Sequence, residues 1–237
     1  MKKRMVLALA GSLLPAMASF GATVTVGWSA YSAGDGEFQA TPHGWDPIGS
    51  YSPLAAWGGS FQTFCIETDI YFAPGATMGV YLSQNTMPPA PPEGGRGYLT
   101  KGVAYLYYEF ATGKLTGYDY ANTSSHAYGD YNGRQADARL LQETLWFLQN
   151  EGSAPGSDKF LSLTTGLTDP TAPNAGAYPV QVMVTSGGWD ASGYPLNTYN
   201  GEQYDQNFLT LPDGGVTAML LGMGLVGLGW VRRQVKR

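Results

Sequence analysis

The chain has 237 residues, of which 13% are charged and 13% aromatic, and it contains 33 glycines. Few charges with many tyrosines and glycines indicate a β-rich extracellular domain rather than a disordered chain. Seven of the 13 basic residues and one of the 18 acidic residues lie at positions 2–4 and 213–237, which leaves 6 and 17 in between, a net charge of about −11. Such a surface repels phosphate backbones, which argues against nucleic-acid binding.

The N-terminus has the pattern of a secretory signal peptide. Three basic residues at positions 2–4 precede an apolar run, Met5–Leu14, and small residues follow it. The run is shorter than the roughly 20 apolar residues that span a bilayer. We therefore expect residues 1–22 to be removed, with cleavage between Ala18 and Ala22.

The C-terminus has a second apolar run, Val216–Val231, which ends in a basic cluster that includes Arg232 and Arg233. Its roughly sixteen residues make a helix of about 24 Å. This pattern predicts a short transmembrane tail whose basic end stays in the cytoplasm. The part of the chain from about Thr23 to Asp213 is then exported.

A short motif precedes this run: Pro212, Asp213, Gly214 and Gly215. The order of motif, apolar span and basic end resembles the exosortase sorting signal of the PEP-CTERM family, in its Val-Pro-Asp-Ser/Gly-Gly variant, with Leu211 in place of Val. The resemblance covers residues 211–237. It implies processing by a membrane exosortase and release or transfer to the surface of a Gram-negative bacterium that makes exopolysaccharide. A plain single-pass tail anchor is the alternative.

Strands are predicted where apolar and polar residues alternate, at residues 22–29, 61–67, 76–83, 178–186 and 206–211. The residues expected to share one face are Val24, Val26 and Trp28 in the first strand, Phe61, Thr63 and Cys65 in the second, opposite Phe64 and Ile66, and Val180, Val182 and Val184 in the fourth. Residues 32–53 and 87–97 are rich in glycine and proline and are predicted to be loops.

Two helices are predicted between the strands. Leu99, Val103, Leu106 and Phe110 recur at helical spacing before Gly113, and Leu141, Leu145 and Leu148 form a stripe within residues 133–152, with Gly152 at the end. Strands, two helices and further strands predict one α+β domain, residues 23–210, with a β-sandwich or barrel body and a two-helix insertion.

Cys65 is the only cysteine, in the motif Phe64-Cys65-Ile66-Glu67, and Gln142 lies in a later motif, Leu141-Gln142-Glu143-Thr144-Leu145-Trp146. The pair of motifs, with an aromatic helix between them, resembles the bacterial thioester domains of surface adhesins. Leu141 stands where that family usually has Thr. The resemblance implies an internal thioester between the Cys65 sulfur and the Gln142 side-chain carbonyl carbon. Its shielding residues would be aromatic: Phe64, Trp146, Phe147, Tyr105 and Tyr107.

The chemistry of these residue types fits that reading. A thiolate is a strong nucleophile, and an amide becomes a usable electrophile when the fold holds the two groups together. Two other readings of Cys65 stay open. It is a small buried hydrophobe with no chemical role, or, in an exported protein, it forms an intermolecular disulfide.

Other candidate sites are weak. His43 and His126 lie in no ligand-spaced cluster, so no metal site or cofactor is expected. Glu67 and Asp69 are predicted to be surface charges rather than a catalytic carboxylate pair. We expect no enzyme, but an exported adhesion protein that attaches covalently to amines or hydroxyls of a surface protein or polysaccharide. The rivals are a structural or carbohydrate-binding matrix protein with a free Cys65 and, last, a secreted hydrolase.

Overall fold

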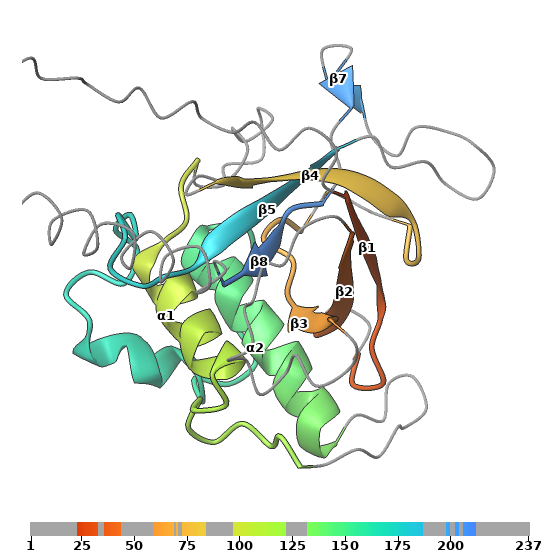
Figure 1. Cartoon of the computed structure of the whole chain (residues 1–237). Coiled ribbons are helices and arrows are strands. Elements are labelled where there is room, and N and C mark those ends of the chain that lie inside the picture. The colour runs from red at the N-terminus through yellow and green to blue at the C-terminus, as the bar shows by residue number, and fades with distance from the viewer. Residues whose placement is uncertain are drawn as a thin grey trace, which may run out of the picture.

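Figure 1 shows the computed structural model of the chain, which describes residues 23–32, 36–43, 59–68, 70, 73–83, 97–121, 132–186, 198–199, 202–203 and 206–211. The elements in chain order are β1 (Thr23–Trp28), β2 (Phe38–His43), β3 (Phe61–Thr63), β4 (Thr77–Ser83), α1 (Lys101–Ala111), α2 (Gly133–Gln149), the 3-10 helix η2 (Leu161–Gly166), β5 (Gln181–Ser186), β6 (Thr198–Tyr199), β7 (Glu202–Gln203) and β8 (Phe208–Thr210).

The two ends of the chain lie outside the described residues. These ends hold the predicted signal peptide, residues 1–22, and the motif, apolar run and basic cluster predicted for residues 212–237. Among the residues that are described, we find no helix with the length and apolar character needed to cross a membrane.

Six strands form one antiparallel sheet in the order β3-β2-β1-β4-β5-β8, and β6 and β7 form a separate small hairpin. The sheet curls until its first and last strands meet (Figure 1). The Thr63 hydroxyl donates to the Leu209 carbonyl oxygen at 2.6 Å, and the Leu209 N–H donates to the Phe64 oxygen at 3.2 Å. The body is therefore a nearly closed barrel, with a seam between β3 and β8.

The curled sheet encloses an inner cluster drawn from all six of its strands. Its members are Val24, Val26, Phe38, Ala40, Phe61, Cys65, Met78, Val80, Met183 and Phe208. The expected face is confirmed for Val24 and Val26, whereas Trp28, at the end of β1, is 55% exposed and tilts against Phe38 at a ring-centroid distance of 5.3 Å.

A second, helix-side cluster lies between the sheet and the two helices. It contains the predicted helix stripes and the predicted opposite strand faces, namely Leu99, Val103, Leu106, Phe110, Leu141, Leu145, Leu148, Phe64, Ile66, Val180, Val182 and Val184. These faces are confirmed. Since Phe64 and Ile66 belong to this cluster and Cys65 to the inner cluster, the seam segment contributes to both.

Both predicted helices are present, and their ends have clear local causes. Thr100 caps α1 by accepting the Val103 N–H, and Gly113 (φ 73°) follows the helix in the left-handed conformation, where glycine has no steric penalty. The second helix was predicted to end at Gly152, but α2 ends at Gln149 because Asn150 (φ 63°) takes the left-handed position. Asparagine tolerates this conformation better than most residues do.

One strand was missed. Residues 32–53 were predicted to be a loop, yet β2 lies within them and pairs with β1 along its whole length, from Thr23 opposite His43 to Trp28 opposite Phe38. The segment FQATPH contains a proline and few apolar residues, so its own pattern is weak. Hydrogen bonding to β1 and β3 on either side stabilises this segment as a strand although its local strand propensity is low.

A buried ion pair joins the β1–β2 connection to the start of α2. Glu37, fully buried, accepts hydrogen bonds from the Arg134 guanidinium and from the Tyr118 hydroxyl, and Arg134 also lies 3.6 Å from the centre of the Tyr31 ring. Burial raises the pKa of Glu37, and Arg134 opposes this shift. The contacts fix α2 against the barrel two turns before Gln142.

Candidate functional site

Cys65 lies at the seam of the barrel, in a short extension of β3. It forms an antiparallel bridge with Phe208, flanked by the bond from the Ile66 N–H to the Asn207 oxygen at 3.1 Å. Neighbouring residues of an extended segment direct their backbone groups to opposite sides. The backbone groups of Phe64 and Ile66 bond to the β8 side, so those of Cys65 point the other way, towards α2.

Gln142 meets these backbone groups. The Cys65 N–H donates to Gln142 Oε1 at 3.0 Å, and Gln142 Nε2 donates to the Cys65 oxygen at 2.8 Å. Gln142 is fully buried and Cys65 is 5% exposed. The Gln142 side chain is therefore in direct reciprocal contact with the Cys65 backbone, although the two residues are 77 positions apart in the sequence.

A close backbone approach brings Gln142 to this place. Gly36 packs against α2, where an added Cβ would lie 2.7 Å from the Ala138 oxygen and 3.0 Å from the Gln142 Cβ. A side chain at position 36 would push α2 away from the barrel. Gly36 and the neighbouring pair Glu37–Arg134 thus hold the helix turn that carries Gln142.

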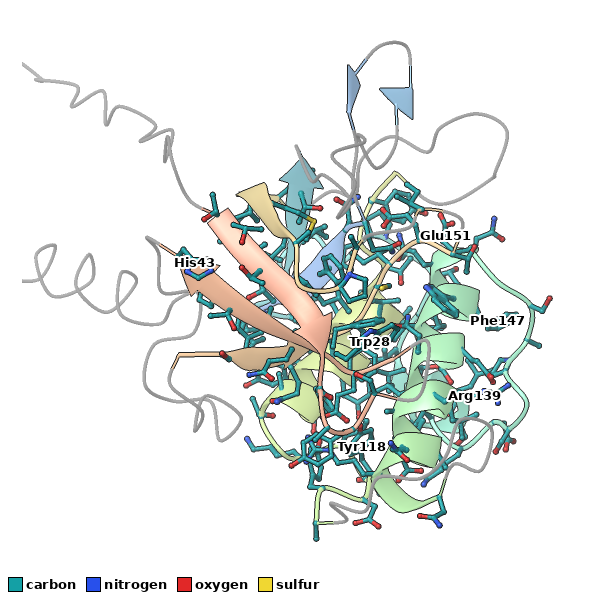
Figure 2. All side chains as sticks on the ribbon, turned by 90° about the vertical axis from the view of Figure 1, so that its right-hand side faces the viewer. Trp28, His43, Tyr118, Arg139, Phe147 and Glu151 are labelled. Atoms are coloured by element: carbon teal, nitrogen blue, oxygen red, sulfur yellow. The ribbon has the colours of Figure 1, made fainter. Side chains whose placement is uncertain are left out.

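Of the five aromatic residues expected to shield the thioester, Trp146 alone packs against the inner cluster that contains Cys65. Its indole Nε1 is buried and has no hydrogen-bond partner among the described residues. Phe64 lies on the helix side, where its ring meets Phe110 at 5.0 Å; Tyr105 packs against Tyr178, and Phe147 is 38% exposed. Figure 2 shows Phe147 on the outer surface of α2.

Tyr107 contributes differently. Its hydroxyl is buried and donates to the Gln62 oxygen at 3.1 Å, so it ties α1 to β3 just ahead of the cysteine. This contact supports the seam from the helix side.

Glu67 is not the surface charge that the sequence predicted. Its carboxylate is buried and accepts from Asn207 Nδ2 at 2.6 Å, from the Asn207 N–H at 3.0 Å and from Gln206 Nε2 at 3.2 Å. Burial raises its pKa to about 7, opposed by the Asn207 donors. Asp69, the other member of the supposed pair, lies outside the described residues.

Sequence reasoning missed the roles of Glu67, Gln206, Asn207 and Gly36. Glu67 stands among alternating residues that suggest a strand with one solvated face, and nothing local signals that Gln206 and Asn207 return beside it. The contact spans about 140 positions, as the Asn207 pairing shows. Gly36 sits in a glycine-rich segment where turns are the ordinary explanation.

The resemblance to thioester domains implies one specific reaction between these two residues. The Cys65 sulfur would attack the Gln142 side-chain carbon, the carbon–nitrogen bond would break, and the nitrogen would leave as ammonia with the thiol proton. The Cys65 N–H, 3.0 Å from Oε1, is placed to stabilise the oxyanion of the intermediate. No co-reactant is needed for this condensation.

The two histidines and the predicted sorting motif contribute nothing to this site among the described residues. His43 is exposed and its Nε2 lies 2.9 Å from the Thr25 hydroxyl, while His126 and the motif Pro212–Gly215 lie outside the described residues. Within the described ranges, no three side chains that could bind a metal ion lie close together.

Comparisons with protein-family models, with curated proteins and with solved structures found no match to this chain.

Proposed function

We propose that this protein is an exported surface or extracellular-matrix adhesin whose barrel domain forms an internal Cys65–Gln142 thioester and uses it to attach covalently to amine or hydroxyl groups. The protein would act once per molecule rather than as an enzyme. Export, exosortase processing and the membrane-bound precursor rest on the sequence patterns of the two ends. The thioester rests on one observation, the reciprocal hydrogen bonds between Cys65 and the Gln142 amide.

Burial supports the proposal. A thioester is a stored electrophile, and water must be kept from it until a partner arrives. Cys65 and Gln142 are 5% and 0% exposed, and the partly buried Trp146 packs against the inner cluster that contains the cysteine. Well-oriented reacting groups reach effective molarities of about 10⁵ M or more, and such positioning would favour attack on an amide carbonyl.

The intact mass of the purified exported protein tests the proposal. We expect a mass one ammonia below that of the processed sequence, with no titratable thiol in the unfolded protein. Methylamine should add its own mass and release one thiol. Cys65→Ala should abolish both changes. A wild-type mass equal to the plain sequence, with a thiol that titrates after unfolding, would contradict the proposal.

One observation favours a second candidate function, a non-catalytic structural or carbohydrate-binding matrix protein. Gln149, on the same helix, braces backbone in the same manner without a cysteine: its Oε1 accepts the Thr100 N–H at 3.3 Å and its Nε2 donates to the Tyr98 oxygen at 2.6 Å. A buried glutamine therefore has a structural use in this fold.

The two glutamines give a matched comparison. Under the adhesin proposal, Gln142→Ala restores the plain mass and a free thiol, whereas Gln149→Ala keeps the thioester mass and only lowers stability. If the wild-type protein and both variants all have free thiols, Gln142 has the same structural role as Gln149, and the matrix-protein function is favoured.

A further inference from the structure

We propose that Glu67 is a positioning residue for the Cys65–Gln142 pair: its buried carboxylate clamps the segment after Cys65 to Gln206 and Asn207 and so sets where the cysteine lies between β8 and α2. This inference rests on the proposed function and adds a part to the same site. It concerns where the reacting groups are held, not a group that touches them.

The clamp is built from amide donors alone. One carboxylate oxygen accepts from Asn207 Nδ2, the other from the Asn207 N–H and from Gln206 Nε2, and Gln206 Nε2 also donates to the Glu67 backbone oxygen at 2.8 Å. The residues involved are almost fully buried: Glu67 is 9%, Gln206 1% and Asn207 0% exposed. Each contact joins the segment that follows Cys65 to the segment that enters β8.

The clamp acts on the cysteine through the backbone. Ile66, between Cys65 and Glu67, donates to the Asn207 oxygen, and Cys65 itself bridges Phe208. Without the side-chain contacts, these two backbone links would form the end of the pairing between the Cys65 segment and β8, and we expect that end to open. Cys65 would then shift relative to Gln142, because Gln142 lies on α2 and is held separately by the packing of Gly36 against that helix.

The ionisation state of Glu67 determines how strongly its carboxyl group binds Gln206 and Asn207. The ionised carboxylate accepts all three donors, whereas a protonated one turns an acceptor into a donor that faces an amide N–H. Among the described residues, no charged side chain contributes to this balance: burial raises the pKa of Glu67 to about 7, and the Asn207 donors and a backbone N–H oppose the shift. Among the described residues, the acidic residue Glu151 is joined to the same segment through its backbone oxygen, which accepts the Thr68 hydroxyl at 2.8 Å. The clamp should therefore loosen as the pH falls through neutrality.

The test measures thioester formation during refolding of the full exported chain, by intact mass, between pH 6 and pH 8.5. Glu67→Gln keeps the shape but presents a donor at every pH. We expect formation at pH 8 to be slower by about tenfold to a hundredfold, because misplacement of reacting groups costs rate on that scale. The variant's profile should retain the rise from thiol ionisation but lose the additional step near pH 7.

Two further variants distinguish a loss of positioning from general misfolding: one with a smaller change at the same site and one control at a distant site. Gln206→Ala removes one donor and should slow formation less, with the step near pH 7 retained. Asn174→Ala removes a buried side chain that makes a similar pair of bonds, to the Tyr178 oxygen and N–H, in another loop, and should leave the rate unchanged. Equal rates for wild type and Glu67→Gln, or an unchanged step near pH 7, would overturn the clamp.

A separate measurement tests the Glu67 contacts in the case that no thioester forms. If the wild-type thiol is free, the clamp is measured by the rate at which a thiol reagent labels Cys65 in the folded protein. The ratio of the Glu67→Gln rate to the wild-type rate cancels thiol ionisation, and we expect it to exceed tenfold at pH 8 and to approach one at pH 6. A ratio near one at both pH values contradicts the clamp independently of the thioester.

Discussion

At the scale of single residues, Glu67 couples stability to pH. Its folded pKa of about 7 lies above the ordinary glutamate value of 4.5, so between these pH values the folded state holds a proton that the unfolded state has released. The free energy of unfolding should therefore fall as the pH rises from 4.5 to 7, by up to about 3 kcal/mol from this group. Urea unfolding across this range measures the slope, and Glu67→Gln should flatten it. A variant that keeps the wild-type slope would assign the effect to another group.

The same residue thus has opposite effects on fold and site. Ionisation of Glu67 costs the folded state free energy because the charge is buried, yet it supplies the acceptors that hold Cys65 in place. Free energy given up at a functional site is a recurring feature of proteins that need precise geometry there.

The close packing of Gly36 against α2 leaves no room for a side chain. Gly36→Ala would place a methyl group 2.7 Å from the Ala138 oxygen, so α2 must move and the protein should lose about 1–3 kcal/mol, as overpacked sites do. Gly166→Ala is the matched control, since nothing lies within 4 Å of its added Cβ. Thermal unfolding compares the two, and an equal, small loss would show that α2 adapts without cost.

At the scale of elements, the contact between the β1–β2 connection and α2 depends on the Glu37–Arg134 pair. Arg134→Met removes the cation and leaves a buried carboxylate without its partner, which should cost about 3–5 kcal/mol. Arg139→Ala breaks the exposed Arg139–Glu143 pair on the same helix and should cost less than about 1 kcal/mol. Denaturant titration of both variants checks the difference; similar losses would mean that Arg134 acts by size alone.

Local sequence patterns predict some of the helices and strands but not others. Both helices, their apolar stripes and the faces of the Cys65 segment follow from periodicity, because each is set by neighbours within one turn or one pleat. The strand β2 could not be read in this way, since its FQATPH segment depends on partners in β1 and β3. The pairing of Cys65 with Gln142 came from a family resemblance, whereas Glu67, Gln206 and Asn207 meet through a closure that no local pattern encodes.

At the scale of the whole molecule, the seam closes the barrel with few bonds. Thr63→Val removes the buried hydroxyl that donates to the Leu209 oxygen and should cost about 1–3 kcal/mol, since an acceptor is left unpaired. Hydrogen exchange at the amides of Ile66 and Leu209 should accelerate more than in the α1 and α2 backbones. Thr165→Val, which loses only an exposed bond to the Ser162 oxygen, should change little. Uniform acceleration across the barrel would indicate that the seam does not open on its own.

If the proposed thioester forms, ammonia leaves from the position of the Gln142 nitrogen, which donates a hydrogen bond to the Cys65 carbonyl oxygen. By microscopic reversibility, ammonia would then also be able to attack the thioester and rebuild the glutamine. A high ammonia concentration would therefore compete with any target amine or hydroxyl, and a low one would preserve the thioester.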